Sequence, residues 1–361
     1  HEGIRDILIC DEKIITVRES IEIEGLETEV YDAEGKTVIP GLIDQHVHII
    51  GGGGEDGFAS LIPPVTMTGC IRYGVTSVVG LLGTDAHAKS VEALVAKTKA
   101  LREEGMSAWC LTGSYAYPTV TLTGSVGKDI AFIEEVIGVK TAISDHRSSN
   151  ISREELARLA TQARTAGLLA HKPGIVHMHT GRGKEGLKNV IRIIEETDIP
   201  ISQFRPTHCG NQLEDAIAFG KMGGWIDFTA HEGTAEAMLK AKAEVPWEQI
   251  TLSSDANGSF PKWSEDKKLT GMGIGKMETL MECVRELIHA GMPLSEAVMP
   301  LTCNVSEALG LQGRKGTIAA GADADLVFLN ESHEVTDVFC RGTQMMKDGT
   351  VIAKNYYDDL R

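Results

Sequence analysis

Apolar and amphipathic stretches alternate through the middle of the chain, from residue 37 to residue 256. Most of the apolar runs are continuously apolar at their centres rather than strictly alternating, which is typical of parallel strands covered on both faces. We interpret eight such runs as strands: residues 37–49, 75–81, 107–115, 138–146, 174–181, 201–209, 224–230 and 250–256.

Between and after these runs lie stretches with helical periodicity, at residues 90–105, 152–167, 184–198 and 275–291. A glycine ends the first stretch, and Ser152 is the predicted N-cap of the second, with Glu155 three residues further on. A β-then-α alternation with eight strands predicts an α/β fold, a (β/α)₈ barrel of the TIM type.

The two ends of the chain have a different pattern, with short apolar runs separated by polar turns. The simplest arrangement joins both ends in one small β-sandwich domain beside the barrel. We predict that this domain comprises residues 1–39 and 312–361, and that the barrel comprises residues 40–311. The first strand of this domain is expected to precede His1, and the sequence begins without a methionine.

Composition and charge narrow the possible partners. Of the 361 residues, 42% are hydrophobic and 24% are charged, which are values of a globular protein. A net charge of −16 makes nucleic acid and anionic membranes poor partners, and no apolar run has the roughly 20 residues needed to span a bilayer. The seven cysteines form no CxxC pair, which favours reduced thiols and a cytoplasmic location.

Polar residues at the predicted strand ends are candidates for chemistry, because active sites of such barrels lie at the C-terminal ends of the strands. Imidazole and carboxylate groups suit Zn²⁺ and related divalent ions, so the pattern predicts a metal site. The residues are His46 and His48 on the first strand, Lys140 on the fourth, His177 and His179 on the fifth, His208 after the sixth and Asp255 after the eighth.

Two of these positions need interpretation. His177 and His179 share a face of their strand, and His179 lies nearer the barrel mouth, so we predict His179 as the ligand and His177 as a packed neighbour. Lys140 lies in an apolar strand, where burial disfavours its charged form. A neutral lysine amine can add CO₂ and become a carbamate, an anion with two oxygens able to bridge two metals.

Several segments together carry a resemblance that covers nearly the whole chain. They are "GLIDQHVHIIGGGGE", "GVKTAISDHRSS", "HMHTGRG", "THCGN", "SSDANGS" and "GTIAAGADADLVF". The ordered set of HxH, Lys, His, His and Asp resembles the amidohydrolase superfamily, and "GGGGE" and "SDHRS" resemble its isoaspartyl (β-aspartyl) dipeptidases.

The resemblance implies a binuclear zinc site. His46, His48 and Asp255 would hold one ion, His179 and His208 the other, and a carbamate on Lys140 and a hydroxide would bridge them. Asp255 would act as general base and acid, taking the proton of the attacking hydroxide and passing it to the leaving amine. Tyr115 matches the tyrosine that polarises the scissile carbonyl.

The resemblance also implies a substrate pocket. Glu55, behind the four glycines 51–54, is suited to the α-ammonium of an isoaspartyl substrate, and Arg147 is suited to a carboxylate. Thr84 and Ser259 match positions that line the same pocket. Asn211 stands where the family usually carries an arginine, a second carboxylate anchor, and this departure leaves the substrate preference open.

The predicted function is zinc-dependent hydrolysis of the isopeptide bond in β-aspartyl dipeptides by a homo-oligomer. The alternatives are a cyclic-amide hydrolase of the same superfamily, of the dihydroorotase or hydantoinase kind, and a non-catalytic scaffold on the same fold. Scaffolds typically lose metal ligands, whereas this chain retains all of them.

Overall fold

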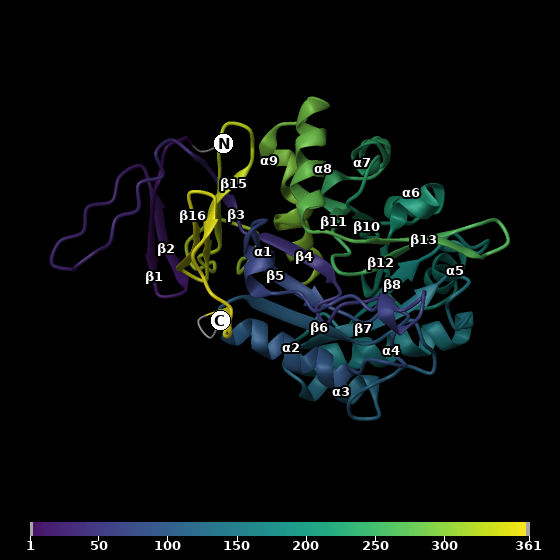
Figure 1. Ribbon diagram of the computed structural model, residues 1–361. Coiled ribbons are helices and arrows are strands. Elements are labelled where there is room, and N and C mark those ends of the chain that lie inside the picture. Colours follow the sequence, from purple (N-terminus) through teal and green to yellow (C-terminus); the bar gives the residue numbers. More distant parts are fainter. Residues whose placement is uncertain (1–2, 359–361) are drawn as a thin grey trace.

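Six parallel strands form one continuous sheet, in the order in which they occur along the chain (Figure 1). They are β4 (Leu42–Val47), β5 (Val75–Gly80), β6 (Ser107–Gly113), β7 (Val136–Ile143), β8 (Ile175–Thr180) and β9 (Phe204–Thr207). Two more parallel strands, β10 (Ile226–Thr229) and β11 (Ile250–Ser253), lie between β9 and β4 and complete the barrel. This computed structural model describes residues 3–358.

Helices cover the outside of the barrel. They are α1 (Met67–Ile71), α2 (Val91–Glu103), α3 (Val126–Phe132), α4 (Arg153–Ala170), α5 (Lys188–Glu196), α6 (Leu213–Lys221), α7 (Thr234–Lys242), α8 (Glu278–His289), α9 (Leu294–Ala297) and α10 (Cys303–Ala308). Short 3₁₀ turns occur at Phe58–Ser60, Ile201–Gln203, Cys209–Gln212, Trp247–Gln249 and Met299–Leu301. Every residue of the eight barrel strands is buried, which explains why most of these strands lack a strict alternation of apolar and polar residues.

The predicted barrel is confirmed, because each of the eight apolar runs contains one of its strands. The predicted start of α4 is also correct: the Ser152 side chain accepts a hydrogen bond from the backbone of Glu155, and the Glu155 side chain binds back to the Ser152 backbone. Helix α5 begins at Lys188 rather than at residue 184. The positive φ of 55° at Gly186 shows why, since such a residue cannot belong to a right-handed helix.

Both chain ends meet in β structure beside the barrel, as predicted (Figure 1). A five-stranded antiparallel sheet joins β3 (Thr37–Pro40) to β14 (Leu326–Leu329), β15 (Val335–Cys340), β16 (Thr343–Lys347) and β17 (Thr350–Val351). The hairpin of β1 (Asp6–Cys10) and β2 (Lys13–Arg18) packs against this sheet through a small core around Ile14, Leu326 and Phe328.

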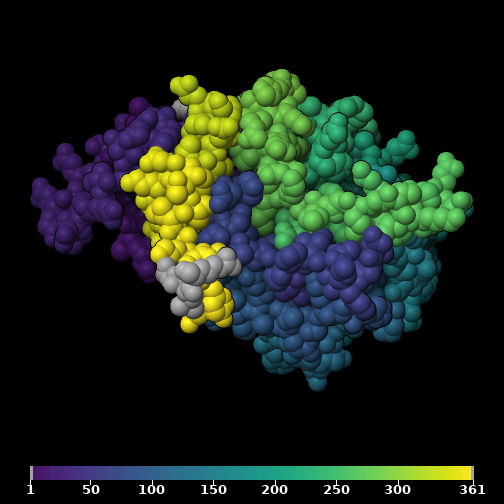
Figure 2. All heavy atoms as spheres, in the orientation of Figure 1, coloured from purple at the N-terminus to yellow at the C-terminus, as the bar shows by residue number. Residues whose placement is uncertain are grey.

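Two segments differ from the pattern-based prediction. Residues 27–36 belong to the end region for which β structure was predicted, but they form no strand; they are rich in acidic groups, and Val30 is 85% exposed. The antiparallel hairpin of β12 (Ser259–Trp263) and β13 (Leu269–Ile274) was not predicted, because its residues are half-exposed and lack clear alternation. This green hairpin projects from the barrel in Figure 2.

All seven cysteines, which lie in the described part of the chain, are free thiols. Within residues 3–358, no helix combines the length and the apolar composition that crossing a bilayer requires.

Candidate metal centre and substrate pocket

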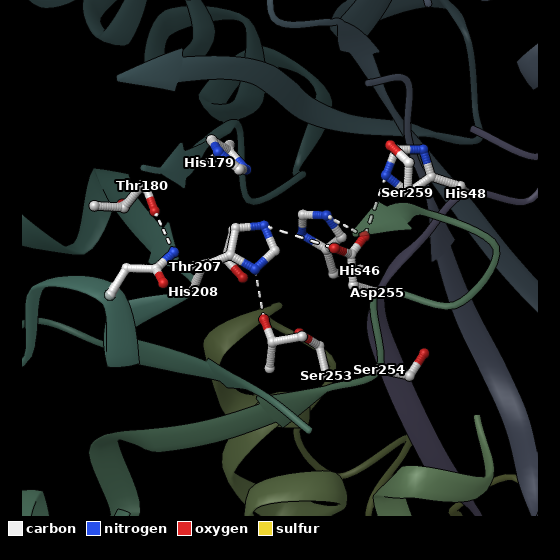
Figure 3. A network of polar contacts seen from close by, with 12 residues as sticks. His46, His48, His179, Thr180, Thr207, His208, Ser253, Ser254, Asp255 and Ser259 are labelled. Atoms are coloured by element: carbon white, nitrogen blue, oxygen red, sulfur yellow. Dashed lines mark hydrogen bonds and ion pairs between the residues drawn. The ribbon is translucent and has the colours of Figure 1, made fainter. Parts of the chain in front are cut away.

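Three histidines surround the Asp255 carboxylate at the C-terminal ends of the barrel strands (Figure 3). Asp255 Oδ1 lies 3.4 Å from His46 Nε2 and 3.2 Å from His48 Nε2. His208 Nε2 lies 4.0 Å from Asp255 Oδ2. One donor atom each from His46, His208 and Asp255 fall within 4.8 Å of one another, a spacing that a metal ion can bridge.

The backbone around these groups is unusual for non-glycine residues. His208 and Asp255 both adopt the left-handed conformation, with φ of 58° and 52°. Such a conformation costs on the order of 1–3 kcal/mol and persists only where the surrounding structure enforces it. Here it turns the chain just after β9 and β11, where both side chains reach the same cluster.

The glycine run after His48 is required by close packing. Gly51 has a φ of 76°, and a Cβ there would lie 1.8 Å from the backbone oxygen of Ile62. A Cβ at Gly52 would lie 3.0 Å from Nδ1 of His48 and 3.2 Å from the backbone oxygen of Asn257. The loop therefore runs directly against a predicted metal ligand, an approach that glycine permits because it has no Cβ.

Two neighbouring side chains fix the orientation of the histidines. Nδ1 of His208 lies 2.5 Å from Thr229 Oγ1, and Nδ1 of His46 lies 2.8 Å from Nε2 of the buried His177. Both contacts leave Nε2 directed toward Asp255, as is common for metal-binding histidines. His177 is thus a packed neighbour of a predicted ligand. Thr229 was missed by the sequence analysis, although its place at the end of β10 could have indicated it.

The protonation states favour metal binding. Burial lowers the pKa of His46 to about 3 and that of His208 well below its usual range, so both imidazoles are neutral and keep a lone pair. Burial opposes ionisation of Asp255, but the His46 and His48 imidazoles outweigh it and hold its pKa well below the usual range. Within residues 3–358, no group forms a hydrogen bond with the buried Oδ1 of Asp255. This set of donors fits a divalent cation such as zinc.

Lys140 lies directly beneath this cluster. Its side chain is fully buried in β7, and its Nζ lies 3.3 Å from Nε2 of His46. Burial lowers the pKa of its ammonium to about 7, so a large fraction of the amine is neutral near neutral pH. A neutral amine at this place is able to react with CO₂.

His179 lies beside the cluster but engages other groups. Its ring centroid lies 4.6 Å from that of His208. The Tyr115 hydroxyl lies 2.5 Å from Nδ1, and Asp145 Oδ2 lies 2.9 Å from Nε2. Burial lowers the pKa of His179 to about 4. A neutral ring that donates to Asp145 and accepts from Tyr115 satisfies both contacts, so both of its nitrogens are engaged by groups other than Asp255 in this structure.

A cavity of about 1450 Å³ lies over the cluster. It brings together every residue predicted to bind substrate, and it also reaches the hairpin of β12 and β13 through Trp263. The predicted residues in its wall are Glu55, Thr84, Tyr115, Arg147, Asn211 and Ser259, together with His48, His179, His208 and Asp255.

Glu55 has one satisfied and one unsatisfied oxygen in this pocket. Its Oε1 accepts hydrogen bonds from Thr84 Oγ1 at 3.1 Å, Ser259 Oγ at 2.8 Å and Arg147 Nη1 at 3.1 Å. Its Oε2 is buried and has no hydrogen-bond partner among residues 3–358. A buried acceptor without a partner is costly, so this oxygen marks a position for a ligand that carries a donor.

Arg147 is already surrounded by acidic groups. Its Nε and Nη2 donate to both oxygens of Asp145, at 3.0 and 2.9 Å, while Nη1 reaches Glu55. The guanidinium also lies 5.5 Å from the centroid of the Tyr115 ring. Asp145 was missed by the sequence analysis; its position in "SDHRS", between a strand end and Arg147, was the available signal.

Asn211 uses both ends of its amide to hold a neighbouring loop. Its Nδ2 donates to the backbone oxygen of Thr180 at 3.1 Å, and its Oδ1 accepts from Nε of Arg182 at 3.0 Å. Asn211 therefore holds the guanidinium of Arg182, which belongs to a different loop, in the wall of the pocket.

The sequence and the structure of this chain are similar to those of known proteins. The model of the amidohydrolase family matches residues 37–345. The β-aspartyl dipeptidase of Fervidobacterium islandicum AW-1, solved in complex with the β-Asp-Leu dipeptide, is 41% identical with a TM-score of 0.93, and the match covers 98% of this chain and 95% of that chain. The dihydroorotase of Pelotomaculum thermopropionicum is 26% identical over 90% of this chain and 84% of its own length.

More distant structures share the fold alone. The D-hydantoinase of Thermus sp. is 20% identical with a TM-score of 0.68, over 97% of this chain and 93% of that chain. The chain belongs to the amidohydrolase family, and it is a metal-dependent hydrolase. Within the family, the chain is similar to β-aspartyl dipeptidases, with 40% and 41% sequence identity to two solved structures.

Proposed function

We propose that the protein hydrolyses the isopeptide bond of β-aspartyl dipeptides, using two Zn²⁺ ions per chain. The observation that carries this proposal is the buried, unpartnered Oε2 of Glu55 in the pocket wall beside the histidine cluster. An isoaspartyl substrate offers a free α-ammonium next to its scissile β-carbonyl, and this group would satisfy that oxygen through a charge-assisted hydrogen bond. The 41% identity to a β-aspartyl dipeptidase supports the same assignment.

The metals would be held by His46, His48 and Asp255 on one side, and by His179 and His208 on the other. For this, one nitrogen of His179 would have to exchange its contact with Tyr115 or Asp145 for the metal. When bound, such a metal pair polarises a carbonyl and makes a water acidic enough to attack at neutral pH.

Lys140 would complete the centre as a carbamate. Its neutral amine forms a bond to the carbon of CO₂ and loses a proton, so a cation is replaced by an anion with two oxygens. The fully buried position and the pKa of about 7 support this step, because an unmodified ammonium would be repelled by divalent cations.

Asp255 and Tyr115 would then serve the reaction itself. Asp255 accepts a proton from the attacking water and gives it to the leaving nitrogen as the C–N bond breaks. The Tyr115 hydroxyl, which reaches His179 here and lines the pocket, donates to the carbonyl oxygen as negative charge develops on it. Arg147, beside Glu55, is the group we assign to the α-carboxylate.

The test is hydrolysis of β-Asp-Leu compared with α-Asp-Leu, dihydroorotate and hydantoin, with metal content measured on the same preparation. Cleavage of β-Asp-Leu alone, with about two metal ions per chain, supports the proposal. Turnover of a cyclic amide without cleavage of β-Asp-Leu contradicts it.

A cyclic-amide hydrolase is the second candidate, because the dihydroorotase similarity spans 90% of the chain. Cyclic amides such as dihydroorotate and hydantoin have no ammonium to pair with Glu55, and this is why we favour the dipeptidase.

A further inference from the structure

Arg182 lies in the pocket wall without a carboxylate partner. It follows His179 by three residues, in the loop after β8, and its side chain is exposed toward the cavity. Its Nε donates to Asn211 Oδ1 at 3.0 Å. Among residues 3–358, no acidic side chain forms an ion pair with it, so the two Nη groups remain available for a ligand.

The loop that carries Arg182 is held tightly in place. Nε2 of Gln212 donates to the backbone oxygens of Gly181 and Gly183, at 3.1 and 2.8 Å. On the other side, the Gly183 amide donates to the backbone oxygen of Ser144 at 2.6 Å. A Cβ at either glycine would lie 2.5 Å from that same oxygen. The approach is too close for any other residue, so the backbone position of Arg182 is well determined.

The charges of a β-aspartyl dipeptide match the charged groups of the pocket. The α-ammonium and the α-carboxylate sit on one carbon, and Glu55 and Arg147 are in direct contact at 3.1 Å. This pair therefore suits the aspartyl half of the substrate. The third charge is the C-terminal carboxylate of the leaving residue, which lies on the other side of the scissile bond.

Arg182 and Glu55 both line the pocket but contact different residues of its wall. Asn211, which holds Arg182, follows His208 by three residues. Glu55 instead contacts Ser259 and lies in the loop that packs on His48. The pocket therefore holds an acidic site for the ammonium and a separate basic group, Arg182, which has no acidic partner among residues 3–358.

We propose that Arg182, oriented by Asn211, binds the carboxylate of the leaving residue and makes the enzyme select dipeptides with a free C-terminus. This inference rests on the proposed function and adds a specificity-determining residue to it. The guanidinium presents paired N–H donors to a carboxylate, and an amide at the same place of the substrate offers no charge.

The experiment compares β-Asp-Leu with β-Asp-leucinamide, which lacks only the carboxylate charge. We expect the unaltered enzyme to prefer β-Asp-Leu by roughly tenfold or more in kcat/KM, mainly through KM, because the contact is present in ground and transition states alike. Arg182→Gln should remove this preference by lowering kcat/KM for β-Asp-Leu much more than for the amide. Asn211→Ala should weaken the preference, since Arg182 loses the acceptor that orients it.

Lys184→Gln is the matched control, because Lys184 is an exposed cation of the same loop that also lines the cavity. It should keep the preference. Metal content of each variant should equal that of the unaltered protein, and so should the thermal unfolding of Arg182→Gln and Lys184→Gln; Asn211→Ala should unfold at a lower temperature, because it also loses the hydrogen bond to the Thr180 backbone.

Three results would each overturn the role of Arg182. In Arg182→Gln, kcat/KM could fall equally for both substrates, or the preference for β-Asp-Leu could stay unchanged. In Lys184→Gln, that preference could be lost. Equal cleavage of β-Asp-Leu and its amide by the unaltered enzyme would also overturn the role of Arg182. In that case the proposed β-aspartyl dipeptidase activity would still hold. If neither β-aspartyl substrate is cleaved, the proposed function fails, and this inference fails with it.

Discussion

Replacing Glu55 by glutamine tests the assignment of the ammonium site. Glutamine keeps the shape of the side chain and can place its oxygen where Oε1 accepts from Thr84, Arg147 and Ser259. Its amide nitrogen then takes the place of Oε2, the oxygen without a partner. An acceptor with negative charge becomes a neutral donor at the one position where we place the substrate ammonium.

The magnitude follows from the burial of the site. The Glu55 side chain is only 9% exposed, so water screens its charge weakly. A hydrogen bond to a charged group contributes about 1.5–3 kcal/mol. At 1.36 kcal/mol for each factor of ten, Glu55→Gln should lower kcat/KM for β-Asp-Leu by roughly 10- to 150-fold. Metal content should not change, because Glu55 contacts none of the predicted ligands among the described residues.

The assay is steady-state hydrolysis of β-Asp-Leu and of its N-acetylated form. Acetylation removes the ammonium, so the unaltered enzyme should cleave the acetylated peptide poorly. In Glu55→Gln, the difference in kcat/KM between the free and the acetylated peptide should be smaller. Asp56→Asn is the control, because it removes the same charge from the next, exposed residue. Full activity of Glu55→Gln, or equal cleavage of both peptides by the unaltered enzyme, would refute this role of Glu55.

Three further predictions concern the metal centre, the chemistry and the glycine loop. Lys140→Ala should lose most of its metal and activity, with partial rescue by a short carboxylic acid, as metal analysis and activity assays can show; full metal content would contradict the carbamate. Tyr115→Phe should lower kcat by about 10²–10³-fold with little change in KM, since its hydroxyl acts on charge that develops in the transition state; a change confined to KM would be inconsistent with this. Gly51→Ala should destabilise the protein in denaturant unfolding by more than Gly57→Ala. Both glycines have positive φ, for which alanine costs about 1–2 kcal/mol, but only Gly51 would also place a Cβ against backbone, 1.8 Å from Ile62 oxygen; equal losses would contradict the steric argument.

Regular elements were predictable because their signals are local. The burial of β7 on both faces is visible in its apolar sequence, and the N-cap of α4 is visible in Ser152 and Glu155. The hairpin of β12 and β13 was not predictable, because its residues are half-exposed and so are not constrained to an alternating pattern.

The sequence by itself determined which groups gather at the barrel mouth. In a parallel barrel every strand ends on the same face, so His46, His48, His208 and Asp255 had to meet once the strands were assigned. The reason is topological, and it does not depend on the details of packing.

The tertiary structure alone decided which side chains are paired and which are left without a partner. Contacts such as Thr229 with His208 and Arg182 with Asn211 join residues from different loops and strands. The same holds for Arg147, which contacts two carboxylates, and for Oε2 of Glu55, which has no hydrogen-bond partner in the described part of the chain. Hydrogen bonds depend on separations of a few tenths of an ångström and on angle, and neither quantity is encoded in the spacing of residues along a chain.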